Sequence, residues 1–380
     1  MLSNEKMPLL HAVRGFAAFY VVVFHAKYAL WSGGQDYISR FPRSEWGFLD
    51  YMTFALDMLS ANGTAMVIVF FVLSGFFIAY SFDKNSWPLK DFFINRAIRI
   101  YVPFLFSVFL SVAVLLIIKE TNPVLAEPNV DRQFNNRIVA AFTNLNFVGV
   151  VSSLFFLPYG QNKYIGFNMV YWSLLYEAIF YLLIPITINR LKPYLGVSIV
   201  ALFISFFFRS QFPLLRYFLE FSIYFAAGLS LFHFMKANPG IRPMNAILLQ
   251  LVMVALFLAT VFFGLLDWLQ LSHMLAGALS ILLIIYIINY EVKENLIIKF
   301  FKKLGVISYT LYLVHFPILI LLYSILNKIT GTFVFYDRIY WIGVAIATLV
   351  SFPLYALIEE KSIKVISALK KKKLGPKIKS

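Results

Sequence analysis

An arginine and a histidine lie eleven residues apart inside the first apolar run of the sequence, and both side-chain types can do chemistry there. A guanidinium binds phosphate or carboxylate, and an imidazole exchanges protons near neutral pH. Eleven residues of α-helix return to nearly the same face, so Arg14 and His25 are predicted to share one. Two interpretations stay open here: a functional pair, or an arginine that reaches lipid headgroups beside a histidine held by a neighbouring helix.

Two further arginines, Arg96 and Arg99, are three residues apart where a later apolar run begins. Residues at this spacing project from the same side of a helix, and two guanidiniums there could clamp phosphates. Positive residues also flank membrane spans on the cytoplasmic side for reasons of topology alone. The spacing does not decide between these alternatives.

A glutamate lies within another apolar run, where an unpaired charge is costly. Ser173 and Glu177 are four residues apart and therefore share a helix face, and Trp172 directly precedes them. Such a glutamate must be paired or functional. Four other ionisable residues lack companion motifs and are interpreted as packing or interfacial groups: Glu220, His233, His273 and His11.

A stripe of polar side chains is predicted in the last third of the chain. Ser308, Tyr312 and His315 fall on one helix face, and Pro317 could kink that helix and open a cavity. Polar residues also join membrane helices through hydrogen bonds, so this alternative stays open. No His-Glu-x-x-His, Walker or Rossmann pattern occurs, and we predict no metal and no tightly held cofactor.

The elements that must position these residues are membrane helices. Of the 380 residues, 61% are hydrophobic and 13% are charged, far from the usual composition of a soluble domain. This predicts an all-α, polytopic membrane protein with no appended soluble domain. The net charge of +15 is better matched by anionic lipid headgroups than by nucleic acid, because the charges lie between apolar runs and in a C-terminal tail. The absence of cysteine excludes disulfides, thiolate metal sites and a cysteinyl acyl-enzyme.

Ten segments are apolar and long enough to cross a membrane, at about 20 residues each. They are residues 8–28, 63–82, 98–118, 170–189, 195–209, 214–235, 244–264, 271–290, 304–326 and 338–358. Residues 137–157 are apolar but interrupted by polar side chains, and we interpret them as an interfacial or re-entrant segment. With both termini in the cytoplasm, 22 of the 33 Lys and Arg lie inside, as the positive-inside rule requires. The predicted organisation is one membrane-embedded domain, residues 1–368, and a basic cytoplasmic tail, residues 369–380.

These motifs, in this order, resemble the acyltransferase-3 family of integral membrane O-acyltransferases, which decorate bacterial surface carbohydrates. The resemblance covers residues 6 to 361, nearly the whole chain. It rests on Arg14-Gly15 with His25, Val69 to Phe76, Arg96 and Arg99 with Tyr101 and Pro103, Trp172-Ser173 with Glu177 and Tyr181, and Leu304-Gly305 with Ser308-Tyr309 and Tyr312 to Pro317. Two features depart from the pattern: the usual closing Glu-Lys-Pro reads Glu360-Lys361-Ser362, and the external hydrolase-like domain of some members is absent.

The resemblance implies transfer of an acyl group, usually acetyl from acetyl-coenzyme A, to a glycan hydroxyl in the bacterial cytoplasmic membrane. By analogy, His25 is the essential first-helix histidine, Arg14 is its paired arginine, and Arg96 and Arg99 meet the donor. We expect His25 to act as the base, with Glu177 and His315 as further catalytic residues. Candidates for contact with the acceptor or for support of the catalytic residues are Ser74, Trp172, Ser173 and Tyr312. The expected partners are acyl-CoA, a glycan or glycolipid acceptor and membrane lipids.

Two alternatives remain open. In a double displacement, the acyl group would pass first to His25 or Ser74 and then to the acceptor. From a different class, the chain could be a carrier or flippase for a lipid-linked glycan, with its buried charges as a proton relay. Against transport, the sequence shows no repeated halves and no paired Gly- or Pro-broken helices. The sequence indicates neither the acceptor nor an oligomeric state.

Overall fold

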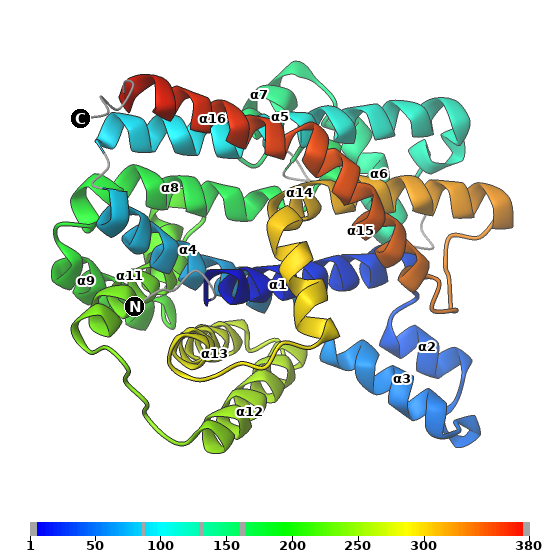
Figure 1. The fold of residues 1–380 in the computed structure, drawn as a ribbon. Helices are drawn as coiled ribbons and strands as arrows, with labels where there is room; N and C mark the ends of the chain where they lie inside the picture. The colour runs from blue at the N-terminus through cyan, green and yellow to red at the C-terminus, as the bar shows by residue number, and fades with distance from the viewer. Residues whose placement is uncertain (1–5, 86–87, 129–132, 160–163, 375–380) are drawn as a thin grey trace. The chain divides into compact units, whose positions relative to one another are not determined.

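The chain is all-α. The computed structural model describes residues 6–85, 88–128, 133–159 and 164–374, with the backbone alone for 85 and 368–374, and no strand occurs in these ranges. Figure 1 shows the helices, which the chain's own contacts group into two compact units. Unit 1 comprises residues 1–86, 173–308 and 336–338, and unit 2 comprises 87–172, 309–335 and 339–380. The predicted fold class is confirmed.

Eight helices of the described chain are long and apolar enough to cross a membrane. They are Lys6–Leu30, Gly63–Lys84, Leu89–Thr121, Pro213–Ala237, Ala246–Leu265, Leu269–Asn289, Leu296–Thr330 and Tyr340–Ser367. Two of the ten predicted spans fall on shorter helices, α8 (Tyr171–Thr187) and α9 (Leu191–Ser205). At 1.5 Å per residue, the 15 residues of α9 cover only about 22 Å, less than a usual bilayer core. The polytopic character is therefore established, while the count of ten stays a prediction.

The doubtful segment at 137–157 forms two helices, α6 (Gln133–Thr143) and α7 (Phe147–Leu154), bent by 102° at their junction. Asn146 caps α7, because its side chain accepts the Gly149 N–H at 2.9 Å, and this cap starts a new helix in a new direction. The bend excludes a straight crossing. A re-entrant loop and a broken span both have this form.

A topology measurement separates these forms. We expect a reporter fused after Lys379 to be active on the cytoplasmic side, because the 22 to 11 division of Lys and Arg favours an even number of spans. Paired reporters that respond on opposite sides of the membrane, at this position and after Asn289, measure it. Activity on the external side after Lys379 would contradict the expectation and would make residues 137–157 a span.

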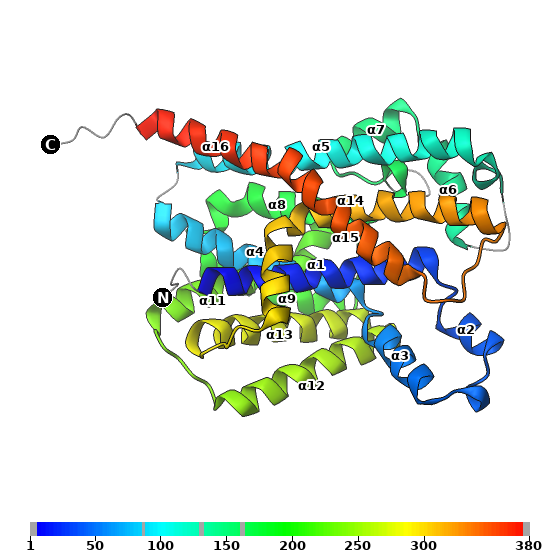
Figure 2. The same cartoon turned by 45° about the vertical axis from the view of Figure 1, so that its right-hand side comes forward.

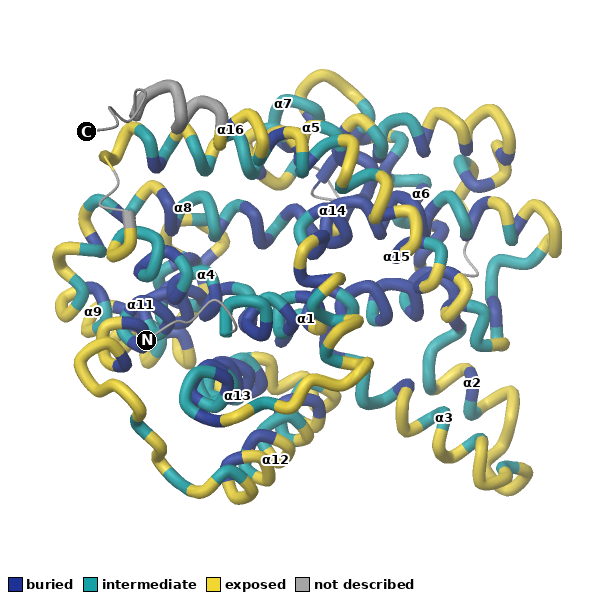
Figure 3. Tube along the Cα trace, in the orientation of Figure 1, coloured by how far each residue is buried: buried dark blue, intermediate teal, exposed yellow. Residues whose placement is uncertain are grey.

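Unit 1 is built on α1 (Lys6–Leu30), α4 (Gly63–Asn85), α11 (Ser222–Ala237) and α13 (Leu269–Asn289). The helices α4 and α11 pack backbone to backbone, since a Cβ at Gly75 would overlap the Phe225 carbonyl and one at Gly228 the Val72 carbonyl. Helix α12 (Ala246–Leu265) packs on α13 and exposes much of its surface, as Figure 3 shows. The short helices α2 (Gly34–Arg40) and α3 (Phe48–Leu59) form an outer hairpin after α1 (Figure 2).

A second close crossing joins α1 to the first part of α14 (Leu296–Thr330), the part that belongs to unit 1. A Cβ at Gly15 would overlap the Phe301 carbonyl, and one at Gly305 would overlap the His11 carbonyl. Both glycines belong to the motifs that carry the family resemblance. Their role is therefore to let the helix of Arg14 and His25 lie directly against α14.

Unit 2 contains α5 (Leu89–Thr121), α6, α7, the later part of α14, α15 (Tyr340–Leu357) and α16 (Glu359–Leu374). Helix α16 lies along α5 (Figure 1). The buried Glu359 at its start accepts hydrogen bonds from Thr310 of α14, at 3.1 Å from the backbone N–H and 2.6 Å from the hydroxyl. The helix continues past the predicted tail boundary to Leu374, and the side chains of the predicted basic tail, residues 369–380, lie outside those that the structure describes.

Candidate active site

Arg14 and His25 lie on one uninterrupted helix, so the spacing that places them on one face applies as predicted. His25 is buried at 8% exposure and Arg14 is partly buried. Phe24, beside His25, packs so closely on Gly63 that a Cβ there would overlap its ring. Unit 1 thus holds the imidazole in a packed position on a helix that is fixed on two sides.

Glu177 lies in a cluster of hydroxyl groups within unit 1. The Ser74 hydroxyl of α4 donates to Glu177 Oε1 at 3.3 Å and lies 3.2 Å from the Tyr181 hydroxyl, which also donates to Oε1. Tyr181 is one turn after Glu177 on α8. The structure therefore joins two residues that were predicted separately, Ser74 and Glu177, and adds Tyr181. A direct pairing of Glu177 with His25 stays a prediction.

Trp172 and Ser173 form the first turn of α8, where the chain passes from unit 2 to unit 1. Ser173 is buried at 5% exposure, and Trp172 is partly buried. Both were predicted as supporting or acceptor-contacting residues, and that role stays a prediction.

Arg96 and Arg99 lie two turns inside α5, because this helix begins at Leu89, earlier than the predicted span. The Arg96 guanidinium stacks over the Phe92 ring with 5.7 Å to the ring centre, and both arginines are partly buried. Just after the pair, the Tyr309 hydroxyl donates to the Ile100 carbonyl at 3.0 Å. The two cations therefore belong to one continuous helix of unit 2, and their contact with a donor stays a prediction.

Pro317 has a specific structural consequence in α14. Because proline has no N–H, the Leu313 carbonyl one turn earlier loses its usual helical donor. Two other groups of unit 2 replace it: the Ser107 hydroxyl at 2.7 Å and the Asn168 amide at 3.0 Å. Tyr171 adds its hydroxyl to the same network, 2.8 Å from Ser107. A buried polar network thus joins the proline motif to α5 and to the turn before α8.

His315 and Tyr312 lie in this part of unit 2. His315 is fully buried and its Nδ1 donates to the Leu311 carbonyl at 2.9 Å, which fixes the tautomer, since a carbonyl only accepts. The Tyr312 hydroxyl donates to the Val170 carbonyl at 3.4 Å. These contacts hold α14 against the turn that starts α8. A role for either residue with the acceptor stays a prediction.

A double-mutant cycle tests the replacement of the missing proline donor. Asn168→Ala alone should lower the free energy of unfolding by about 1–3 kcal/mol, because a buried carbonyl loses a donor. In a Pro317→Ala background the restored N–H can bond the Leu313 carbonyl, so the same change should cost less, with a coupling of at least about 0.5 kcal/mol. Thermal and denaturant unfolding of the detergent-purified protein measures this.

Asn122→Ala is the matched control. Its amide bonds the Ser324 carbonyl at 3.0 Å and the Asn327 side chain at 2.9 Å, elsewhere between α5 and α14. Its effect should add to that of Pro317→Ala without coupling. Equal coupling at Asn122 and Asn168 would show that the proline acts on the whole helix instead.

Three of the four ionisable residues without companion motifs have ordinary partners in unit 1. Glu220 pairs with Arg216 at 3.0 Å, and the His273 ring lies 3.3 Å from the Thr64 hydroxyl. His11 stacks on Phe77 with 5.5 Å between ring centres. These contacts agree with the packing interpretation. Within the described ranges, no three His, Asp or Glu side chains gather as a metal site would require.

Sequence reasoning missed several polar residues that the structure brings together. Ser107 and Asn168 bond a main-chain carbonyl, and only Pro317 signalled that such a group would need a donor. Lys27, Asp57 and Arg338 form an ionic network in unit 1 although 281 residues separate the last two. The sequence signal for this network is Asp57, because it is a charged residue in an otherwise apolar stretch.

The comparison with known families decides the broad identity. A family model described as an acyltransferase domain matches residues 8–359. The chain belongs to the acyltransferase-3 family. The match covers every predicted site residue, and with the apolar helices it identifies a polytopic membrane acyltransferase. Comparisons with curated proteins and with solved structures find no match.

Proposed function

We propose that this acyltransferase moves an acyl group, acetyl in the first instance, from cytoplasmic acyl-CoA to a hydroxyl of an exported or cell-surface carbohydrate. The observation that carries the proposal is the acyltransferase match over residues 8–359, within which the first helix presents Arg14 and His25 on one face. The protein would lie in the bacterial cytoplasmic membrane with both termini inside, which the charge distribution supports.

The donor side of the proposal rests on three arginines. Coenzyme A carries several phosphates, and guanidiniums bind phosphate through charge-assisted, bidentate hydrogen bonds. Arg14, near the start of α1, and Arg96 and Arg99, in the first turns of α5, are near the helix ends that we assign to the cytoplasm. We assign the three residues to the donor's phosphates.

The transfer itself needs one base. In our proposal, neutral His25 accepts the proton of the sugar hydroxyl while its oxygen attacks the thioester carbonyl. The C–S bond breaks, the CoA thiolate leaves and takes up a proton, and the new ester stays on the sugar. No oxidant, reductant or metal is needed. Glu177 and His315 are proposed to support the base and to orient the acceptor.

The acyl-enzyme route has a specific candidate in Ser74. Its hydroxyl donates to the Glu177 carboxylate, and a hydroxyl beside a base is the usual arrangement of an activated nucleophile. Incubation with radiolabelled acetyl-CoA in the absence of acceptor, followed by denaturation, separates the routes. Label on the protein that disappears in Ser74→Ala would establish the two-step route, and direct transfer leaves no label.

Mass spectrometry of the host's surface and exported carbohydrates tests the function as a whole. The glycan from cells that lack the gene should be lighter by one acyl group per modified sugar. Mild alkali should remove the same mass from wild-type glycan, because an ester is base-labile. A carrier or flippase predicts a different result. In that case the glycan would be missing from the surface rather than present without its ester.

A further inference from the structure

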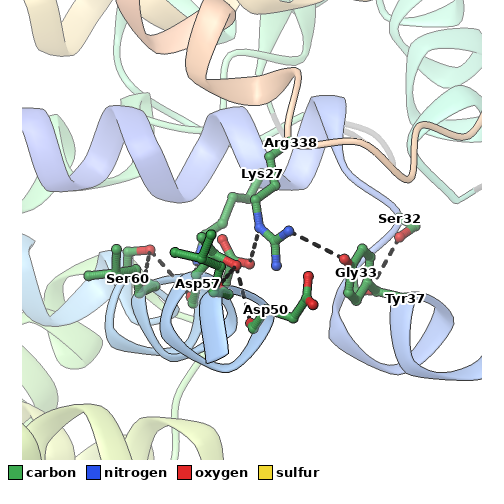
Figure 4. A network of polar contacts seen from close by, with 11 residues as sticks. Lys27, Ser32, Gly33, Tyr37, Asp50, Asp57, Ser60 and Arg338 are labelled. Carbon is green, nitrogen blue, oxygen red and sulfur yellow. Dashed lines mark hydrogen bonds and ion pairs between the residues drawn. The ribbon is translucent and has the colours of Figure 1, made fainter. Parts of the chain in front are cut away.

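A buried ionic network lies at the C-terminal end of the first helix, and Asp57 of α3 is its centre (Figure 4). Its carboxylate binds the Arg338 guanidinium at 3.0 Å, and its main-chain carbonyl accepts a hydrogen bond from the Lys27 ammonium of α1. Asp57 is 0% exposed and Lys27 7% exposed. All three residues belong to unit 1 and come from distant parts of the chain.

Arg338 also makes two contacts with Tyr37 of α2. Its Nη1 donates to the Tyr37 hydroxyl at 3.3 Å, and its guanidinium lies over the Tyr37 ring with 4.9 Å to the ring centre. Burial alone would lower the pKa of Arg338, but the hydrogen bonds to Tyr37 and Asp57 and the charge of Asp57 raise it above its ordinary value. The guanidinium therefore stays charged, and it ties α2, α3 and the loop before α15 together.

The C-terminal end of helix α3 is hydrogen-bonded to α1. The last carbonyls of a helix lack intrahelical donors, and a cation there is also attracted by the negative end of the helix dipole. Two side chains of α1 supply donors: Lys27 to the Asp57 carbonyl and Tyr20 to the Leu59 carbonyl, the latter at 2.8 Å. Tyr20 also accepts the Asn62 N–H at 3.2 Å. Two points of α1 therefore hold one helix end.

The periodicity of α1 separates this contact from the proposed base. Tyr20 and Lys27 are seven residues apart and lie within about 20° of one face, whereas His25 lies about 140° around the helix from Tyr20. Arg14, at eleven residues from His25, shares the face of His25. The end of α3 therefore contacts the side of α1 that faces away from Arg14 and His25. Its two contacts, at Tyr20 and Lys27, lie before and after His25 along the helix axis.

We propose that Asp57, with Lys27 and Arg338, is a positioning element for acyl transfer: it fixes the rotation and depth of α1, and through them the place of His25. In this proposal the three residues act through the position of α1 and not on the reacting atoms. The inference rests on the proposed role of His25. Because a displacement of about 1 Å can cost a hundredfold in rate, a network that fixes a helix acts on turnover rather than on donor binding.

Steady-state kinetics with acetyl-CoA and purified host glycan test the proposal. Asp57→Asn keeps the main-chain carbonyl that Lys27 uses and removes the carboxylate charge, which acts on both Arg338 and Lys27. We expect kcat to fall about tenfold to a hundredfold, with the KM for acetyl-CoA within about twofold of wild type, in the folded fraction isolated by size exclusion. Arg338→Gln should behave in the same way, and Arg338→Lys should recover part of the loss.

The matched control is Asp83→Asn, which also neutralises an ion-paired aspartate. Asp83 binds Lys236 on the surface, with side-chain exposures of 38% and 55%, and an exposed pair contributes little. It should leave both kinetic constants unchanged. A kcat for the folded Asp57 and Arg338 variants equal to that of Asp83→Asn would overturn the proposal, and so would a raised KM with unchanged kcat.

A second readout does not depend on activity, and it uses the absence of cysteine from the chain. Ala29→Cys places a single thiol on α1 at a position with 0% exposure, where maleimide should react slowly. We expect labelling to accelerate when Asp57→Asn is added, and not with Asp83→Asn. If Asp57→Asn accelerates labelling but the wild-type protein shows no acyl transfer, the proposed function is refuted and the role of the Asp57 network in positioning α1 stands. An unchanged labelling rate in Asp57→Asn would refute the role of the network in positioning α1.

Discussion

Replacement of His25 by alanine is expected to abolish acyl transfer while leaving an expressed, folded protein. A general base contributes about 10²–10⁴-fold in rate, and His25 is the base that α1 presents on the same face as Arg14. An imidazole held only for packing would behave in the opposite way, because its loss would lower stability and change turnover little. The measurement is transfer from labelled acetyl-CoA in purified membranes, normalised to folded protein.

His273→Ala is the matched control for this experiment. His273 is a span histidine of the same unit, bonded to the Thr64 hydroxyl at 3.3 Å, and it has no proposed role. Its replacement should leave turnover near normal. Near-normal turnover of His25→Ala, together with its loss in His315→Ala or Glu177→Ala, would show that the base is misassigned and that α1 only guides the donor.

Loss of either arginine of α5 is expected to weaken use of the donor about tenfold to a hundredfold. A charge-assisted hydrogen bond is worth roughly 1.5–3 kcal/mol, and the acceptor makes no use of a phosphate clamp. The KM for acetyl-CoA should therefore rise in Arg96→Ala and Arg99→Ala, while the KM for the glycan stays near its wild-type value. Initial rates at varied concentrations of each substrate measure the two effects.

Arg190→Ala is the control for charge alone. Arg190 is exposed at the start of α9, in a segment that we place on the cytoplasmic side, and it lies outside the proposed site. It should not alter the KM for acetyl-CoA. An unchanged KM for acetyl-CoA in both α5 variants would contradict donor binding and would show that Arg96 and Arg99 only flank a membrane span on its cytoplasmic side.

The long helices could be predicted from sequence because a membrane span is recognised by apolar length alone. Every predicted span falls on an apolar helix, but α5 and α14 extend well beyond the predicted segments, to 33 and 35 residues. Their extra turns are amphipathic or charged, and hydropathy does not count them. The division of the chain into two units was not predictable, because α8 and α14 pass from one to the other without a linker.

The candidate site could be predicted only where its members share one helix. Periodicity placed Arg14 with His25, and Ser173 with Glu177, since residues at helical spacing need no tertiary information. The contact between Ser74 and Glu177 joins different helices over 103 positions, and no local pattern specifies it. The resemblance named both residues without pairing them.

Main-chain groups explain most of what was missed. The Leu313 carbonyl and the end of α3 are acceptors that no side-chain motif displays, yet they attract Ser107, Asn168, Tyr20 and Lys27. The sequence motifs contain glycines whose role no local pattern explains, and the structure shows why two of them must be small. Gly15 and Gly305 each lie where a Cβ would overlap the backbone of the facing helix.

Transfer across oriented membrane vesicles tests the central claim most directly. Inside-out vesicles that expose the cytoplasmic face receive acetyl-CoA labelled in its acetyl group, and the carbohydrate fraction is then isolated and counted. We predict label in an alkali-labile ester on the carbohydrate, dependent on this protein, absent with His25→Ala and absent when sealed right-side-out vesicles receive the same donor. Carbohydrate without label from active, sealed inside-out vesicles, or equal label from both orientations, would contradict the account.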